Sequence, residues 1–433
     1  MLRHTWQDQR VRFDIICAGG GGATTAVLHA LADLDLAGGL ADEVSVLVVD
    51  PVPLGDTETR HRTWSFWAQG TPSVAPAISA SWRHVRVAGD DFDELLDLDP
   101  MRYHLVRSTD FADFAEGQVA QAPHVEVTRV QARVESVTQR GMTTTVTWEG
   151  GKACAALVLD SRPCAPARAP TVWWWQHFRG WLLPANAVEG IPASLMDFRT
   201  PQPPAGLSFG YLLPLPDGRA LAEYTEFSPD RLDESVYDTR VRSYLDRLGI
   251  APDIEPEHVE TGAIPMTNAV FTRRPSTRVL RIGTAGGATR GSTGYTFTAM
   301  LRDGHAIAAW AAAGGLAGDK PIQVPAHYPA LHRWLDSVQL QALAGGRVNG
   351  PDFFTGLFAA QPAPRVLRFL DGVSTLAEDV AVISSAPIVP MMMAAVDDAA
   401  ARLRSAARGL SRRQPNPEHV VPAPPTPRRG GNH

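Results

Sequence analysis

The segment Phe13-Asp-Ile-Ile-Cys-Ala-Gly-Gly-Gly-Gly-Ala-Thr-Thr25 joins an apolar strand to a glycine turn, and the helix-forming run 26–32 follows it. The pyrophosphate of a dinucleotide needs backbone that it can approach closely, together with the unpaired N–H groups and positive dipole end of a helix N-terminus. Gly19 and Gly21 occupy the first two glycine positions of the dinucleotide-binding fingerprint, and Thr24 stands at the third. The segment therefore predicts a dinucleotide-binding α/β fold.

A second apolar strand, 44–49, ends in Asp50, whose carboxylate could accept hydrogen bonds from ribose hydroxyls. The distance from the glycines to this acid is longer than usual, and an insertion at 33–42 accounts for the difference. The alternative is an ordinary α/β core with a glycine-rich turn and a solvent-facing Asp. The order of strand, turn, helix, strand and acid favours the nucleotide site.

Length and composition limit the classes of protein to consider. A chain of 433 residues would usually divide into two or three domains. Its net charge of −6, without a dense basic block before the C-terminus, argues against nucleic acid as the main partner. The three cysteines have no metal-ligand spacing, the first ten residues lack an apolar signal core, and no window has the ~20 apolar residues of a spanning helix. We therefore expect a cytoplasmic protein, at most associated with a membrane surface.

The middle of the chain alternates strands and turns. Four strand-like runs between His124 and Leu159 suggest a meander, and the last of them leads into Asp160. From Trp173 onward, aromatic residues alternate with Pro and Gly, which is typical of a second, β-rich domain around an apolar surface. The segment 278–295 then repeats the pattern of strand, glycine-rich loop and helix start, and we expect the helix 297–313 to end at the Gly pair that follows it.

The sequence beyond this second loop is mainly helical, and it ends in a segment rich in Pro and Arg. Five arginines follow a short Ala-rich run and could contact an anionic membrane, with a solvated, disordered end as the alternative: Arg402, Arg404, Arg408, Arg412 and Arg413. The predicted dinucleotide-binding domain is discontinuous and consists of 11–70, 101–165 and 278–315. The predicted β-rich domain consists of 71–100 and 166–277. A helical region, 316–410, and a disordered tail, 411–433, are expected to follow.

Five motifs follow one another in an order that resembles a known family. They are Arg62-Thr-Trp-Ser-Phe66, Gln176-His-Phe-Arg-Gly180, Tyr211-Leu-Leu-Pro214 with Leu221-Ala-Glu-Tyr-Thr225, Glu260-Thr-Gly-Ala-Ile-Pro-Met266 and Ser292-Thr-Gly-Tyr295. With the glycine turn, they are similar to the flavin-dependent lycopene cyclase family, the soluble-type carotenoid cyclases of bacteria and plants. The resemblance runs from about residue 13 to about residue 403. It implies a Rossmann-like FAD-binding domain, a β-rich substrate domain and a helical C-terminal region.

The resemblance also implies a mechanism without net redox change that nevertheless needs reduced FAD. In this family a carboxylic acid protonates the end of a polyene, and electron-rich groups stabilise the carbocation until the ring closes. Such an acid has to be held neutral in an apolar pocket, where desolvation raises its pKa, and aromatic faces can stabilise the positive charge. NAD(P)H is the expected source of electrons, and the expected ligand is a lipophilic polyene or a prenylated small molecule.

The family motifs then assign roles to residues of this chain. Glu223 aligns with the first acid of the family's acidic motif, and an ion pair with an Arg at a domain seam is the alternative. Tyr224 stands where the family has a second acid, so the expected catalytic residues are Glu223, Tyr224 and Glu226, the last because it shares the strand face of Tyr224. Arg62 and Glu260 lie in family motifs at the expected pocket edge, with a structural salt bridge as the alternative.

Two further groups follow from the resemblance. The expected cofactor-binding residues are Gly19, Gly21, Gly22, Ala23, Asp50, Arg62, Thr63, Asp160, Gly286, Gly287, Thr293, Gly294 and Tyr295. The expected substrate pocket consists of Trp64, Phe66, Trp174, Phe178 and Tyr211, and no metal site is expected. Each aromatic residue could instead belong to an ordinary core.

Other flavin-dependent activities compete with cyclisation. A monooxygenase or halogenase would share the fold, but Thr284 stands where many such enzymes have the Asp of a Gly-Asp pair. A prenyl reductase would use reduced flavin to deliver hydride to an isoprenoid, and a non-catalytic carotenoid-binding protein would not need Glu223. The sequence favours a cyclase acting on lycopene or a related acyclic carotenoid, with a prenylated natural product second because of Tyr224.

Overall fold

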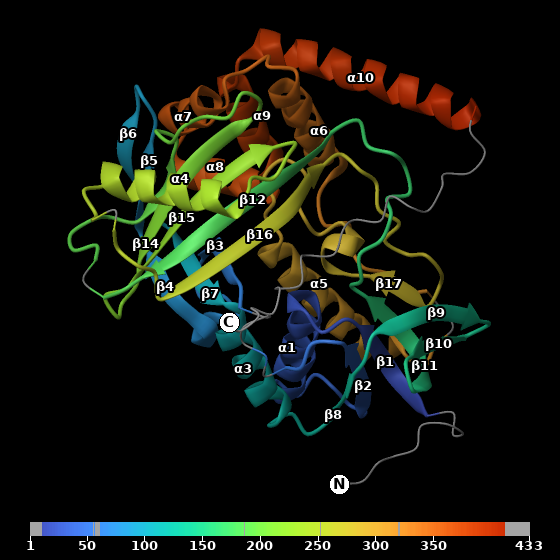
Figure 1. Cartoon of the computed structure of the whole chain (residues 1–433). Helices are drawn as coiled ribbons and strands as arrows, with labels where there is room; N and C mark the ends of the chain where they lie inside the picture. The colour runs from blue at the N-terminus through green and yellow to red at the C-terminus, as the bar shows by residue number, and fades with distance from the viewer. Residues whose placement is uncertain are drawn as a thin grey trace, which may run out of the picture.

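A computed structural model describes residues 11–54, 56, 61–185, 187–251, 253–318 and 321–411 (Figure 1). The first sheet is built around near-continuous apolar runs, which form central parallel strands buried on both faces. Its parallel strands are β8 (Val125–Gln131), β2 (Val44–Asp50), β1 (Arg12–Ala18), β11 (Gly151–Asp160) and β17 (Val279–Arg281), and the antiparallel strands β10 (Thr143–Trp148) and β9 (Val134–Arg140) follow β11 at one edge. This is the predicted Rossmann-like α/β fold.

One predicted pairing in this sheet is wrong. The strands between His124 and Leu159 do not form one meander, because β8 pairs in parallel with β2 at the opposite edge from β9 and β10. The crossing α3 (Ser108–Val119) leads into β8 and allows this parallel pairing. Only β9, β10 and β11 follow one another as antiparallel neighbours.

Two helices cover one face of the first sheet and pack closely together. They are α1 (Gly22–Leu36) and α5 (Phe297–Trp310), followed by the short turn η3 (Ala311–Gly315). A Cβ at Gly304 would lie 2.3 Å from the carbonyl oxygen of Ala26, so the glycine permits the close approach of the two helices. As expected, the helix ends at the Gly pair, where Gly314 has a φ of +77°.

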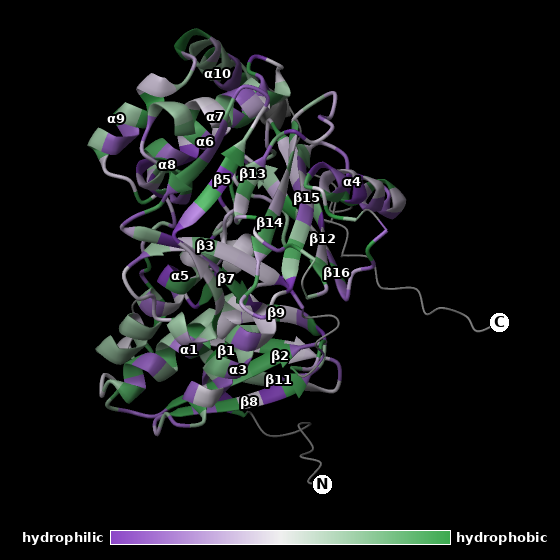
Figure 2. Ribbon diagram, turned by 90° about the vertical axis from the view of Figure 1, so that its left-hand side faces the viewer, coloured by the Kyte–Doolittle hydropathy of each residue, from purple (hydrophilic) through white to green (hydrophobic). Residues whose placement is uncertain are grey.

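A second, mainly antiparallel sheet forms the other half of the molecule. Its order is β16 (His258–Thr267), β12 (Trp173–Leu183), β15 (Ala220–Ser228), β14 (Leu207–Pro214), β13 (Ser194–Asp197), β5 (His84–Ala88) and β6 (Asp93–Asp97). Figure 2 shows α4 (Glu234–Arg247) on one side of this sheet and the C-terminal helices on the other. We call these two sides the α4 face and the inner face.

A small third sheet lies between the two larger ones and consists of β3 (Thr63–Gln69), β7 (Met101–Arg107) and β4 (Ile78–Trp82), with the turn η1 (Ala75–Ala77) before β4. Alternate residues of β3 belong to different cores. Trp64 and Phe66 pack with α1 and α5, whereas Trp67 packs into the core of the second sheet. Strand β3 therefore connects the two halves.

The C-terminal region is helical, as predicted. Its helices are α6 (Ala330–Ala344), α7 (Gly350–Ala360), α8 (Ala363–Asp371), α9 (Leu376–Ser385) and α10 (Ile388–Ser411). Within the described ranges, no single helix is long and apolar enough to cross a membrane, and only the bent pair Leu376–Ser385 with Ile388–Arg404 meets the length and composition test jointly. Arg412, Arg413 and the rest of the predicted tail after Ser411 lie outside the described residues.

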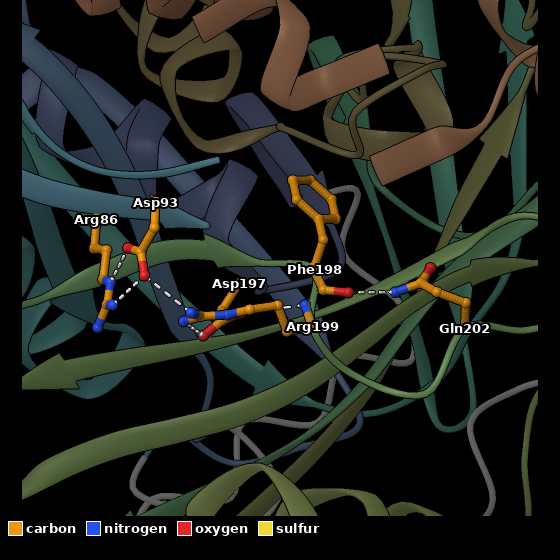
Figure 3. A network of polar contacts seen from close by, with 6 residues as sticks. All are labelled: Arg86, Asp93, Asp197, Phe198, Arg199 and Gln202. Atoms are coloured by element: carbon orange, nitrogen blue, oxygen red, sulfur yellow. Dashed lines mark hydrogen bonds and ion pairs between the residues drawn. The ribbon is translucent and has the colours of Figure 1, made fainter. Parts of the chain in front are cut away.

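Ion pairs fix the far edge of the second sheet (Figure 3). Arg86 of β5 pairs with Asp93 of β6, and Nη1 of Arg199 also donates to Asp93, at 2.9 Å. Asp197 accepts from Nη2 of Arg199 at 2.7 Å, while Gln202 donates to the carbonyl of Phe198 at 2.7 Å. This network connects the loop after β13 to the edge strands β5 and β6. These strands lie at the opposite edge of the sheet from β12 and β16.

Candidate active site

The glycine turn has the geometry of a nucleotide site. Gly19 has a φ of +104°, and a Cβ there would lie 2.2 Å from Oγ of Ser161, so only glycine fits. The hydroxyl of Thr24, at the third fingerprint position, donates to the carbonyl of Gly19 at 2.6 Å and closes the turn. Gly21 is the N-cap of α1, and no side chain in the described part of the chain caps it or lies within 4 Å of its missing Cβ. The helix N-terminus is thus left open toward an anion.

Asp50 lies at the carboxyl end of β2, as expected for a ribose-binding acid. Its carboxylate accepts from the backbone N–H of Gly20 at 2.5 Å and of Val52 at 2.8 Å. A cleft with about 330 Å³ of empty space borders Gly20, Asp50 and Arg129. The acid is therefore held in place by the glycine turn beside a space suited to a nucleoside.

The second glycine loop borders a larger cleft. The short turn η2 (Gly283–Gly286) follows β17, and Gly287 has a φ of +82°. Gly286 and Gly287 line a cleft with about 1330 Å³ of empty space, together with Pro265 of β16 and Trp334 of α6. The second glycine loop therefore has open space beside it.

Polar atoms next to this loop are buried without a partner. Gly294, with a φ of +72°, packs so closely on β12 that a Cβ would lie 2.0 Å from Oε1 of Gln176. Neither Oε1 of Gln176 nor Oγ1 of Thr293 has a hydrogen-bond partner among the described residues. Burying unpaired polar groups is costly, so these atoms fit the polar edge of a bound ligand.

Three residues predicted to bind the cofactor have other partners. Asp160 forms two contacts of 2.9 Å with the guanidinium of Arg162. Thr63 donates to Oε2 of Glu260 at 2.9 Å, and the exposed Arg62 donates to the carbonyl of His61 at 2.6 Å. The structure thus gives Thr63 a buried acid as its partner.

A row of four residues crosses the inner face of the second sheet. Strand pairing aligns Tyr211 of β14 with Glu223 of β15, Glu223 with Gly180 of β12, and Gly180 with Glu260 of β16. A Cβ at Gly180 would lie 3.1 Å from Cγ of Glu260 and 3.2 Å from Oε2 of Glu223. Because Gly180 lacks a side chain, the two carboxyl groups approach each other across it. We call these four residues the acid row.

Glu223 is a buried acid held in a defined orientation. The hydroxyl of Tyr211 donates to its Oε2 at 2.7 Å, and that of Thr225 donates to its Oε1 at 2.5 Å. Burial and, second to it, the charge of Glu260 raise the pKa of Glu223 to about 8, against the two hydroxyl bonds, which lower it. Near neutral pH, Glu223 is therefore mainly a neutral acid that can donate a proton.

Glu260 has a similar environment. Burial raises its pKa to about 7, against the hydrogen bond from Thr63 and the positive charge of Arg62. Its Oε2 lies 3.7 Å from Nδ1 of His61, and the ring of His61 lies 4.2 Å from that of His258. Two acids with raised pKa values in one row are typical of a catalytic site.

Aromatic residues that the sequence reasoning missed lie beside the acid row. Trp67 makes an edge contact of 4.6 Å with Tyr295 and stacks at 6.2 Å on Tyr103. Burial raises the pKa of Tyr103, and the charge of Glu223 adds to this rise, which places the two groups close together. Alternation along β3 was the available signal, since Trp67 and Trp64 have opposite parity.

The predicted pocket residues lie on two different sides. Trp64 stacks on Phe297 at 5.2 Å, and Phe66 lies 5.1 Å from the same ring, so both face the dinucleotide-binding half. Trp174 and Phe178 share the inner face of β12 with Gly180, and Phe178 is half-buried against Gly262. The structure therefore brings Trp174, Phe178 and Tyr211 to the inner face, but not Trp64 or Phe66.

Tyr224 and Glu226 do not join Glu223. They share a strand face, as predicted, but it is the α4 face, where Tyr224 packs with Tyr237 and donates to Glu226 at 2.8 Å. Nε2 of His177 lies 3.7 Å from the same carboxylate. Since neighbouring residues of a strand point to opposite faces, neither position 224 nor Glu226 lies beside Glu223. The acid that does lie beside Glu223 is Glu260.

A Rossmann-type glycine turn combined with a β-rich domain that carries buried acids defines the class of flavin-dependent enzymes. The chain belongs to the lycopene cyclase family, since residues 14–396 match the family described as lycopene cyclase protein. Family and fold together support a flavoprotein enzyme. No curated protein sequence matches the chain significantly.

Three solved structures show the same fold over most of their length. A geranylgeranyl bacteriochlorophyll reductase-like protein from Thermoplasma acidophilum has a TM-score of 0.61 at 11% identity, covering 88% of this chain and 98% of that one. The p-nitrophenol 4-monooxygenase of Pseudomonas putida has a TM-score of 0.51 at 15% identity, and the match covers 89% of this chain and 98% of that one. The Diels-Alderase of the pyrroindomycin pathway has a TM-score of 0.53 at 16% identity, and the match covers 83% of this chain and 80% of that one. At these identities the likeness concerns the fold alone.

Proposed function

We propose that this protein is a flavin-dependent cyclase that closes a ring at the end of an acyclic carotenoid such as lycopene, or of another polyprenoid, without net redox change. The observation that carries the proposal is Glu223, a buried acid whose pKa is raised to about 8 and which two hydroxyls hold in place. Membership of the lycopene cyclase family supports the same reaction class.

The proposed chemistry begins with proton transfer from Glu223. Its O–H bond breaks as a C–H bond forms at one carbon of the terminal double bond, and positive charge develops at the other carbon. A neighbouring double bond attacks this centre and closes the ring, and the adjacent carbon then gives up a proton, which returns to solvent. The product has the same formula as the substrate. A neutral, desolvated acid suits the first step, because only the protonated carboxyl group can donate to the double bond.

The groups around the acid row suit a carbocation. The faces of Trp67, Tyr103 and Tyr295 offer π-electron density within a largely apolar cluster, which stabilises positive charge. The same cluster excludes water, which would otherwise add to the cation and give an alcohol.

FAD would be held at its nucleotide end by Gly19, Gly21, Gly22 and Asp50, and at its flavin end by the loops that carry Gly287 and Gly294. When bound in its reduced form, it supplies negative charge that stabilises the cation. We propose NAD(P)H as the source of electrons.

Product mass tests the function. We expect purified protein, supplied with FAD, dithionite and lycopene, to give a cyclic product of unchanged mass, and no product while the flavin is oxidised. An oxygenase or halogenase would increase the mass, and a prenyl reductase would add two hydrogens per reduced bond. Either result would replace the cyclase assignment with the corresponding alternative.

We also propose that the substrate reaches the site from a lipid bilayer through α9 and α10. Both helices carry exposed apolar residues at helical spacing, with exposed fractions from 38% for Ile383 to 74% for Leu376. This surface, the apolar stripe, consists of Leu376, Val380, Ile383, Ile388, Val389, Met392, Val396 and Leu403. The stripe itself contains no charged residue.

Two observations favour a bilayer as the partner of the apolar stripe. The exposed Arg402 and Arg404 flank its end and can attract anionic lipids. The buried side of α9 contributes Val382 to the same apolar core as Leu221, next to the acid row. Apolar side chains therefore continue from the stripe to the candidate active site, and Figure 2 shows α9 and α10 at the end of the molecule away from the first sheet.

A further inference from the structure

A narrow cleft leads from the surface to the acid row. Its lining includes His258, His61, Arg107, Glu260 and Gly180. Exposure decreases along it, since the side chain of His61 keeps 22% of its surface exposed and that of Glu260 keeps 3%. The cleft lies between the inner face of the second sheet, where β12 and β16 line it, and the strands β3 and β7 of the third sheet.

The groups in this cleft form a series of proton carriers. The rings of His258 and His61 are neighbours at 4.2 Å, and Nδ1 of His61 lies 3.7 Å from Oε2 of Glu260. Within the residues that the structure describes, Nδ1 of His61 and Oε1 of Glu260 are buried and lack a hydrogen-bond partner. Such atoms can each hold a water molecule or exchange a proton.

We propose that His258, His61 and Glu260 form a relay that returns a proton to Glu223 across Gly180 after each ring closure. This inference rests on the proposed function, which leaves Glu223 as a carboxylate after its proton has moved to the substrate. The ring carbon releases a proton later, so the reaction consumes no net acid. Glu223 nevertheless has to regain a proton in place, because it is buried and out of contact with bulk water.

Each transfer in the relay conserves protons. An imidazole ring accepts a proton on one nitrogen and releases one from the other, so His61 can pass a proton inward without remaining charged. Burial lowers the pKa of His61 to about 4, with His258 and Arg107 acting in the same direction, so the ring rests neutral. The carboxyl of Glu260 then gives its proton to the carboxylate of Glu223 and is reloaded from His61.

The charged and titratable groups around the relay come from several elements. Around Glu223 they are Tyr211, Tyr103 and Glu260; around Glu260 they are Arg62 and His61; and around His61 they are His258, Arg62, Arg107 and Asp110. Arg62 and Arg107 oppose a positive charge on His61, so its ring is neutral at rest.

Gly180 leaves the gap across which Glu260 passes a proton to Glu223 in the relay. The methyl group of an alanine there would lie between the two carboxyl groups, at 3.1 and 3.2 Å from their nearest atoms. The backbone of Gly180 has no positive φ, so Gly180→Ala changes the gap without straining the turn of the chain. This variant tests the gap without removing any charge.

The experiment compares the first ring formed per enzyme with steady-state turnover, using FAD, dithionite and lycopene at a pH about two units below the pKa of Glu223, where the acid starts out protonated. We expect His61→Ala to form the first ring at the native rate but to lose at least about tenfold in steady-state rate, since proton transfers contribute that much or more. Added imidazole should restore the steady-state rate of His61→Ala. Glu260→Gln and Gly180→Ala should also form the first ring at the native rate and lose steady-state rate, but imidazole should not restore them.

Glu257→Gln, an exposed acid three residues from Glu260, is the matched control and should keep both rates. Flavin content and Tm report whether each variant is folded. Native steady-state rates in His61→Ala and Glu260→Gln would overturn the relay, as would an equal loss in the first ring and in steady state. If the native chain forms no ring at all, the proposed function fails, and the relay fails with it.

Discussion

Glu223 differs from the other buried acid of its strand, Glu226, only in the face toward which it points. Glu223 faces the apolar inner side with hydroxyl partners, whereas Glu226 lies under α4 beside His177 and Tyr224. This difference makes Glu226 a matched reference for variants of Glu223. Both residues are almost fully buried, so the substitutions are comparable in their demands on folding.

We expect Glu223→Gln to abolish cyclisation while leaving FAD content and Tm nearly unchanged. The amide keeps the shape of the side chain but cannot deliver a proton, and general acid catalysis typically contributes ~10²–10⁴ in rate. Glu226→Gln should lose far less. Turnover assays with quantified flavin measure both variants. Near-normal turnover of Glu223→Gln would move the role of proton donor to Glu260.

The raised pKa of Glu223 also predicts a pH-dependent stability. The folded state binds the proton of Glu223 up to a pH of about 8, whereas the ordinary pKa is 4.5. This contribution to stability is complete below about 4.5 and is lost as the pH rises through about 8. We therefore expect the Tm of Glu223→Gln to rise relative to that of the native chain as the pH increases from about 4.5 to about 8. A constant difference between the two Tm values at all pH values would show that Glu223 titrates normally.

At the residue level, the sequence predicted most of the acid row but not all of its aromatic neighbours. Glu223, Glu260 and Tyr211 could be named because they lie in family motifs. Alternation along 63–69 separates Trp64 and Phe66 from Trp67, but it cannot say which set faces the acids. That depends on how β3 lies between the two larger sheets, and packing of distant segments decides it.

The N-terminus of α1 is the element on which the cofactor assignment depends. We expect Gly21→Asp to lose FAD while keeping or raising the stability of the cofactor-free protein. A carboxylate at the N-cap would accept the N–H groups of the first turn, worth about 1 kcal/mol, and would repel a pyrophosphate. FAD titration and thermal unfolding measure the two effects separately.

Gly21→Asn is the control for this variant, because its side chain caps the helix without a charge. It should retain more FAD than Gly21→Asp. If Gly21→Asp bound FAD as tightly as the native chain, the pyrophosphate would have to lie elsewhere. The space around Gly21 accepts either side chain, so misfolding is not the expected outcome.

The apolar stripe leads to a second prediction at the level of helices, for α9 and α10. We expect Val380→Glu and Met392→Glu each to weaken binding to anionic phospholipid vesicles roughly tenfold, because each loses the insertion of one apolar side chain. Leu95→Glu changes an exposed apolar residue on β6, outside the stripe, and should have no effect. Vesicle sedimentation measures the binding.

Unchanged sedimentation of the α9 and α10 variants would contradict membrane contact. A change in oligomeric state by size-exclusion chromatography, without a change in vesicle binding, would make the stripe a contact between copies of the chain. Sequence reasoning placed the membrane contact on the arginines of the C-terminal segment. The apolar stripe could not be predicted from periodicity alone, because the spacing of a stripe is the same whether a neighbour covers it or not.

Elements of the first sheet were predicted well, with one exception. The strand runs and the glycine turn could be read locally, because hydrophobic periodicity and glycine positions mark them. The pairing of β8 with β2 could not, since the helix that precedes β8 carries the chain back across the sheet. Sequence order alone favoured a meander of neighbours, which is the commoner local arrangement.

For the whole molecule, the acid row shows what sequence cannot supply. Residues 180, 211, 223 and 260 come from four strands, and they meet only because each strand pairs in one register. A slip of one residue in any strand would turn its member of the row to the α4 face. The class of the fold follows from one glycine turn, but the pairing of Glu223 with Glu260 follows only from the complete sheet.

The most direct test of the central claim, that Glu223 protonates the polyene, is cyclisation of lycopene in D₂O with reduced FAD. Glu223 exchanges its proton with solvent, so we predict one deuterium in the product for each ring formed and an otherwise unchanged formula. Product from Glu223→Gln should be absent. A cyclic product without deuterium, or deuterated product from Glu223→Gln at the native rate, would contradict the assignment of Glu223 as the proton donor.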